Sequence, residues 1–93
     1  MKIWKFDLVL QDRQTVEIPA GAKLLTVQNQ RDFFITLWAL CDESAPTQKR
    51  VFDIHGTGNP VSNDPGAYIG TVQIDYGRRS RVWHVFEVVN GDD

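Results

Sequence analysis

The feature that most constrains this chain is the alternation of apolar and polar residues in short segments separated by clusters of turn-forming residues. In the first segment the even positions Trp4, Phe6, Leu8 and Leu10 are apolar, and charged residues stand at positions 5 and 7. A period of two residues is that of a β-strand with one buried face. Because no stretch of ten or more residues keeps the 3.6-residue period of an amphipathic helix, we expect little or no helix.

Segments with this character predict about seven short strands, at residues 2–10, 15–19, 23–30, 33–41, 51–55, 68–76 and 81–89. The first two are expected to form a hairpin through residues 11–14, and residues 77–80 have the composition of a second hairpin turn. The segment 33–41 is apolar at both odd and even positions, which indicates a central strand covered on both faces. Short strands separated by turns every eight to twelve residues or so favour a single antiparallel β-sandwich or small barrel.

The length and composition favour one domain. A chain of 93 residues is too short for two domains of ordinary size, and 42% hydrophobic with 24% charged residues is typical of globular proteins. We therefore expect residues 1–93 to form a single all-β domain, with residues 90–93 as a frayed tail. A domain of this size buries only about 60–65% of the surface of its unfolded chain, so self-association into a homo-oligomer is expected to add stability.

The charge and the cysteine content disfavour several classes of partner and site. A formal net charge of −2 provides no overall positive field, which argues against a nucleic-acid polymer or a membrane surface as the partner. Cys41 is the single cysteine, so we expect no intramolecular disulfide, no cysteine-based zinc cluster and a small buried side chain at this position. The first residues contain neither a signal peptide nor an apolar membrane span, which predicts a cytoplasmic location.

The strongest candidate for a binding site is the long glycine-rich loop that follows the fifth segment. Gly56 and Gly58 allow close approach of the backbone to a ligand, and Thr57 and Asn59 add hydrogen-bond donors, so the loop is predicted to bind an anion. His55 stands where the strand enters the loop, a position from which side chains often point into a cleft. The loop lacks the lysine and the following helix of a Walker motif, and its alternative interpretation is a wide turn that joins two sheets.

A second candidate is the only cluster of basic residues, formed by Arg78, Arg79 and Arg81. Tyr76 and Trp83 stand nearby, and arginine beside aromatic residues is a common way to hold a phosphate or to stack on a base. The alternative is a solvated hairpin tip whose charges protect a sheet edge from aggregation. The two interpretations differ in whether the arginines converge. The loop and this cluster together are predicted to bind a partner protein or a small anionic ligand.

No constellation for catalysis or metal binding emerges from the sequence. His55 and His84 are the only histidines, and no acidic pair stands at a spacing that would make a metal site with them evident. His84 shares its parity with Val82 and Phe86, so we expect a hydrogen-bonded residue on a half-buried face. The serines have no evident histidine partner and the carboxylates are scattered. The sequence therefore predicts no enzyme activity, no cofactor and no metal.

Seven short motifs follow one another along nearly the whole chain: MKIWK from Met1, IPAGA from Ile18, VQNQ from Val27, LWAL from Leu37, HGTGNP from His55, YIGT from Tyr68 and HVFE from His84. As a set they resemble a family of small phage and prophage proteins without assigned function. The chain departs from that family at residues 77–80, where Gly-Arg-Arg-Ser stands in place of paired glycines.

The resemblance implies a phage-type accessory protein that acts by binding, as a host-directed or anti-defence factor that blocks or sequesters a host protein or a small anionic ligand. The alternative is a structural or virion-accessory oligomer, and a small-nucleotide sponge or an enzyme is less favoured. A protein inhibitor would use an apolar or acidic face and needs no pocket. A small-ligand sponge would use the glycine-rich loop together with the arginines.

Overall fold

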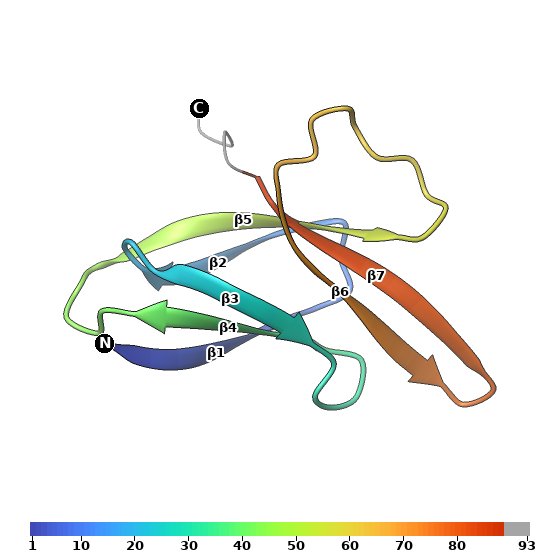
Figure 1. The fold of residues 1–93 in the computed structure, drawn as a ribbon, viewed down its shortest axis with the longest axis horizontal. Coiled ribbons are helices and arrows are strands. Elements are labelled where there is room, and N and C mark those ends of the chain that lie inside the picture. Colours follow the sequence, from blue (N-terminus) through green and yellow to red (C-terminus); the bar gives the residue numbers. More distant parts are fainter. Residues whose placement is uncertain (89–93) are drawn as a thin grey trace.

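The computed structural model describes residues 1–88, and this part of the chain consists of strands, turns and loops without a helix (Figure 1). Its seven strands are β1 (Lys2–Leu8), β2 (Arg13–Pro19), β3 (Lys23–Gln28), β4 (Ile35–Cys41), β5 (Thr47–Gly56), β6 (Ala67–Tyr76) and β7 (Arg79–Glu87). They form two antiparallel sheets, with the orders β1-β4-β3 and β2-β5-β7-β6. The predicted all-β fold with about seven strands is confirmed, as a small sandwich rather than a closed barrel. The predictions for residue 89 and for the tail 90–93 lie outside the described residues.

The core lies between the two sheets, and β4 supplies its centre. Ile35, Leu37, Ala39 and Cys41 are completely buried, and the opposite sheet contributes residues such as Phe52. Because β4 is flanked by β1 and β3, the prediction of a central strand at this position is confirmed. The expectation that Cys41 is a small buried side chain is also confirmed.

The predicted hairpin of the first two strands is wrong. β1 pairs with β4 and β2 pairs with β5, so the connection between them passes from one sheet to the other. The side chain of Gln14 stabilises this crossing, because its amide donates to the carbonyl of Val9 (2.7 Å) and its oxygen accepts the N–H of Val9 (3.0 Å). These bonds occupy the backbone groups that a hairpin ladder would have used.

Some strands begin or end at other residues than predicted. β5 begins at Thr47, opposite Pro19, although residues 42–49 were expected to be a connection. Its first residues are polar because they lie on an exposed part of the sheet, so this part of the strand shows no apolar–polar alternation in the sequence. A hairpin turn lies in the segment 77–80, as predicted, but it is shorter: Tyr76 pairs with Arg79 across a two-residue loop, and Arg79 and Ser80 already belong to β7. Gly77, with φ of 73°, supplies the positive φ required at the first position of a type II′ turn.

The long loop at residues 57–66 joins two strands of the same sheet, so its interpretation as a turn between sheets is wrong. β5 and β6 are both antiparallel to β7 and lie on either side of it, so the loop must pass over the C-terminal part of β7. The loop begins with a turn in which the N–H of Asn59 donates to the carbonyl of Gly56 (3.1 Å), with Gly58 at φ of 91°. These are the features of a type II turn.

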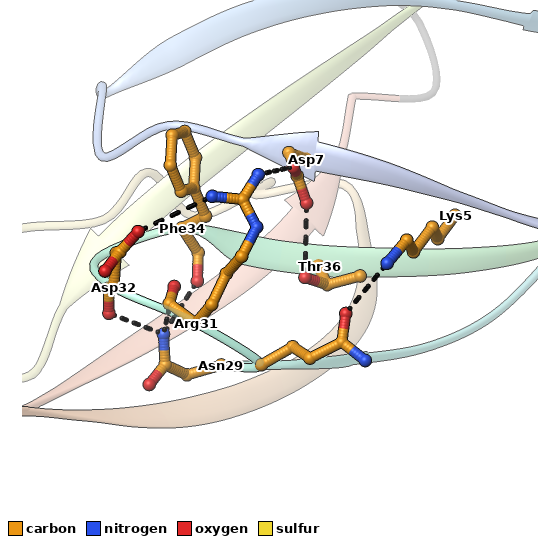
Figure 2. A network of polar contacts seen from close by, with 8 residues as sticks. Lys5, Asp7, Asn29, Arg31, Asp32, Phe34 and Thr36 are labelled. Carbon is orange, nitrogen blue, oxygen red and sulfur yellow. Dashed lines mark hydrogen bonds and ion pairs between the residues drawn. The ribbon is translucent and has the colours of Figure 1, made fainter.

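The turn between β3 and β4 is held by a network of polar contacts (Figure 2). The side-chain amide of Asn29 donates to the carbonyl oxygens of Arg31, Asp32 and Phe34, at 3.3, 3.0 and 2.9 Å. The guanidinium of Arg31 pairs with the carboxylate of Asp7 in β1 (2.7 Å) and lies 4.6 Å from the centre of the Phe34 ring. The turn is therefore fastened both to its own backbone and to the neighbouring strand.

An ion pair that sequence reasoning missed closes one end of the sandwich. Arg50 donates to both carboxylate oxygens of Glu87 (2.5 and 2.8 Å) and to the carbonyl of Ala22 (2.6 Å). Its hydrogen bonds to Glu87 raise the pKa of Arg50 above the ordinary value. The pair connects β5 and β7 with the turn that leads from β2 into β3.

Candidate functional site

A cavity of about 310 Å³ lies where β5 ends beside β7, and we call it the Arg81 cavity. Its lining residues are Gly56, Thr57, Asn59, Ser80, Arg81, Val82 and Trp83. Four residues of the predicted binding site line it, from both the glycine-rich loop and the basic cluster. The loop and one of the arginines therefore do converge.

The cavity exists because β5 leaves the sheet early. β5 pairs with β7 up to the partners Gly56 and Trp83, whereas β6 pairs with β7 as far as Arg79. Beyond Trp83 the N–H of Thr57 still donates to the carbonyl of Val82 (3.1 Å), and the chain then turns away. In an antiparallel ladder alternate residues direct their backbone groups to the same neighbour, so the N–H and C=O of Ser80 face the space that β5 leaves open.

The glycine at position 56 has a packing role in this wall. A Cβ atom there would lie 3.0 Å from the amide nitrogen of Asn59 and 3.2 Å from a ring carbon of Trp83. The absence of a side chain lets the amide and the indole ring close over the end of β5. The indole N–H of Trp83 is buried and has no acceptor among residues 1–88.

The lining is rich in hydrogen-bond donors and carries one positive charge. Arg81 is exposed, and it forms no ion pair within the described part of the chain. The amide of Asn59 and the hydroxyl of Ser80 add neutral donors, whereas the hydroxyl of Thr57 is already bonded to the carbonyl of Val82 and to His84. A guanidinium flanked by neutral donors is suited to a carboxylate or a phosphate group.

His55 lies outside the Arg81 cavity, on the outer face of the four-stranded sheet. It lines a second hollow of about 490 Å³, together with Asp12, Arg13, Asp53, Ile54, Asn59 and Pro60. Arg13 donates to both oxygens of Asp53 (2.6 and 2.8 Å), and these bonds raise the pKa of Arg13. The guanidinium of this hollow is therefore already paired, and the carboxylate of Asp12 adds a negative charge, which makes the hollow a weaker anion site than the Arg81 cavity.

A chain of hydrogen bonds crosses the same outer face. The ring nitrogens of His84 lie 2.8 Å from the hydroxyl of Thr57 and 3.0 Å from that of Thr71, which is 2.5 Å from the hydroxyl of Tyr68. The expectation of a half-buried, hydrogen-bonded His84 is confirmed. Sequence reasoning missed the chain, because Thr71 and His84 come together only through the register of β6 and β7.

The remaining predicted site residues are not in the Arg81 cavity. Gly58 is an exposed turn residue with no atom within 4 Å of a Cβ placed on it. Arg78 and Arg79 are exposed at the tip of the β6–β7 hairpin. Arg79 shares a strand face with Arg81, at a spacing of about 6–7 Å along the strand. The basic cluster is thus divided between the cavity and the tip.

Neither a metal site nor a membrane span is found in the described residues. Within residues 1–88 there is no group of three or more histidine, cysteine, aspartate or glutamate side chains placed to hold a metal ion. The same residues contain no helix long and apolar enough to cross a membrane.

Comparison with known proteins identifies the family of the chain. Residues 1–93 match the model of a family described as a domain of unknown function (DUF7352), and the chain belongs to that family. No curated protein and no solved structure matches the chain. The family description assigns no activity, so the function has to be argued from the geometry of the site.

Proposed function

We propose that this protein is a non-catalytic binding domain that holds an anionic group of its ligand or partner in the Arg81 cavity. The observation that carries the proposal is the position of Arg81, which has no carboxylate partner among residues 1–88 and lies in one cavity with Asn59 and Thr57. A guanidinium recognises a carboxylate or phosphate through charge-assisted hydrogen bonds, and the neutral donors add directional contacts.

The dimensions of the cavity restrict the ligand. A volume of about 310 Å³ is at the lower end of the range for small-molecule sites, which suits one anionic group with its immediate substituent. The indole of Trp83 provides an apolar wall for that substituent. A hydrogen bond to a charged group contributes about 1.5–3 kcal/mol, so the loss of Arg81 should weaken binding by roughly 10- to 100-fold.

The resemblance to small phage and prophage proteins supports a host-directed role for this binding. In this role the protein would act in the cytoplasm of the host cell and sequester an anionic ligand or occupy an anionic group of a host protein, for example one that belongs to a defence system. Neither task requires turnover, in agreement with a site composed of hydrogen-bond donors and one cation.

Titration by ¹H–¹⁵N NMR with inorganic phosphate, adenosine monophosphate and succinate tests the proposal. We expect saturable shifts confined to the amides of residues 56–59 and 80–83 with at least one of these anions. Arg81→Gln should weaken that binding at least tenfold, while Arg78→Gln, a matched change at the hairpin tip, should leave it unchanged. Shifts that do not saturate, or equal effects of the two variants, would contradict the proposal.

Self-association is favoured by a separate observation, the exposed apolar residues of β1. Ile3 and Trp4 are 61% and 38% exposed, Met1 directly before the strand is 74% exposed, and β1 is an edge strand of its sheet. Unpaired apolar edges favour pairing with another chain. This supports the second candidate function, a structural or virion-accessory homo-oligomer. Sedimentation equilibrium tests it: an oligomer that Ile3→Lys converts into monomers supports this candidate, whereas a monomeric wild-type protein excludes it.

A further inference from the structure

Phe33 is held at the surface by a turn that is unusually well fixed. The turn bonds of Asn29 and the pairing of Arg31 with Asp7, described above, fasten the backbone on both sides of it (Figure 2). Asp32 adopts a positive φ of 47°, which aspartate tolerates better than most other non-glycine residues. Even so, 54% of Phe33 is exposed. A fixed turn that presents an aromatic ring to solvent is typical of a binding surface.

Phe33 also bridges the two sheets at this end of the molecule. Its ring stacks on that of Tyr76 in β6, with ring centres 4.8 Å apart and an angle of 20° between the planes. Beside the stack lies a shallow hollow of about 230 Å³ lined by Val9, Leu10, Asp32, Phe33 and Phe34. Four of these five residues are apolar, so the hollow suits one apolar side chain of a partner.

Two arginines stand next to this apolar centre. Arg79 is the cross-strand partner of Tyr76, which places their Cβ atoms about 5 Å apart on one face of the hairpin, and Arg78 precedes it in the turn. Neither arginine forms an ion pair within residues 1–88. Asp32, the acidic residue of the hollow, lies 3.5 Å from the guanidinium of Arg31. The surface thus combines an apolar centre with an uncompensated positive rim.

From this arrangement we infer that the Phe33 surface, defined as Phe33, Phe34, Val9, Leu10, Tyr76, Arg78 and Arg79, docks an acidic protein segment that inserts one apolar residue into the hollow. Aromatic residues and arginine at the centre of a patch are the residues that carry most binding energy in protein interfaces. A nucleic acid fits less well, because two arginines offer few phosphate contacts and the hollow beside them is lined mainly by apolar residues. This inference is independent of the Arg81 cavity and concerns a different set of residues.

Fluorescence anisotropy with two labelled heptapeptides tests the inference. The first peptide has aspartate and glutamate around a central leucine and phenylalanine, and in the second both apolar residues are replaced by serine. We expect the first to bind at least tenfold more tightly and to shift the amide signals of residues 31–34 and 76–79. Phe33→Ser and Arg79→Glu should each weaken its binding at least tenfold. Arg79 is exposed, so Arg79→Glu should keep the wild-type melting temperature. Phe33→Ser also loses the stacking on Tyr76 and should melt a few degrees lower, so its peptide binding is measured well below its Tm, where its NMR spectrum remains that of a folded protein.

A control variant separates this surface from the apolar edge of β1. Ile3→Ser removes an exposed apolar residue there and should leave peptide binding unchanged. Equal binding of the serine peptide, or unchanged binding by Phe33→Ser, overturns the inference. The inference is also overturned if a DNA oligonucleotide displaces the labelled acidic peptide at a lower concentration than the unlabelled peptide does. A third contrary result is an oligomer that Phe33→Ser abolishes, because the occupant of the surface would then be a second copy of the chain. Loss of anion binding by Arg81→Gln, with anion binding intact in Phe33→Ser, tests the proposed function alone.

Discussion

Replacing Glu87 with glutamine should destabilise the protein more than removing the carboxylate of any other ion pair of residues 1–88. The side chains of Arg50 and Glu87 are only 16% and 15% exposed, so the pair is nearly desolvated. In Glu87→Gln the guanidinium of Arg50 keeps its hydrogen bond to the carbonyl of Ala22, but it faces the neutral amide of glutamine instead of a carboxylate. Breaking a fully buried pair costs about 3–5 kcal/mol, and the residual exposure reduces our expectation to about 2 kcal/mol. In a domain of this size that corresponds to a fall of about 8–16 °C in Tm.

Thermal and urea unfolding at neutral pH, followed by circular dichroism, measure this effect. Glu43→Gln is the matched control, because Glu43 pairs with Lys2 and both side chains are largely exposed. Its Tm should stay within about 2 °C of wild type. The double variant Arg50→Met with Glu87→Gln completes a double-mutant cycle. Its loss of unfolding free energy should be smaller than the sum of the losses in the two single variants by at least about 1 kcal/mol. The reasoning is refuted if Glu87→Gln has the Tm of the wild type or if the cycle shows no coupling energy between the two residues.

Further predictions concern the loop and a surface carboxylate. Gly66→Ala should cost about 2–5 kcal/mol in urea unfolding, because φ is 95° and the new Cβ would lie 2.2 Å from a backbone oxygen of β7; Gly58→Ala meets no atom within 4 Å and should cost only about 1–2 kcal/mol. Two hydrogen bonds from Ser44 lower the pKa of Asp42, so in Ser44→Ala an NMR titration should find that pKa closer to the ordinary value. A carboxyl group whose pKa is lowered by folding stabilises the folded state at pH values above the pKa of the unfolded chain, and this contribution disappears as the pH falls through the pKa of the folded state. The free energies of unfolding of the wild type and Ser44→Ala should therefore become equal in acid. An unchanged Asp42 pKa would contradict the second prediction, and equal costs at the two glycines would contradict the first.

The strands with the clearest local signals were predictable from the sequence. β4 is apolar at odd and even positions because one face packs on the core and the other is largely covered, and this burial leaves its mark on consecutive residues. Gly77 marks the β6–β7 turn because few other residues adopt its positive φ. Pairing is a different matter: alternation shows that residues 2–8 and 13–19 are strands, but the partner of each depends on whether the short connection stays in one sheet. The amide of Gln14, whose role is visible only in three dimensions, stabilises the crossing.

The same limit applies to the candidate site. The glycine-rich loop and the basic cluster were recognisable from residue types, but their contact depends on the register that places Gly56 opposite Trp83. That register places Arg81 in the same cavity as Asn59 and leaves Arg78 and Arg79 at the tip of the β6–β7 hairpin. The Phe33 surface was missed because Phe33 counted as part of the apolar run of β4, and the polar residues that hold it outside that strand come from β1 and the end of β3.

Both proposed surfaces follow from one feature of the fold, the early departure of β5 from a longer hairpin. β5 pairs with β7 over Phe52–Gly56 only, while β6 and β7 continue to the turn at Gly77, so the hairpin projects past the end of β5 and past the three-stranded sheet (Figure 1). On the side that β5 has left, β7 offers Arg81 and the backbone of Ser80 to an anion. On the face toward the smaller sheet, the same projection brings Tyr76 against Phe33. Because Arg79 and Arg81 are two residues apart on one strand face, an acidic partner longer than the test peptide can contact both surfaces at once, and its affinity should then fall more in the Arg79→Glu and Arg81→Gln double variant than in either single variant.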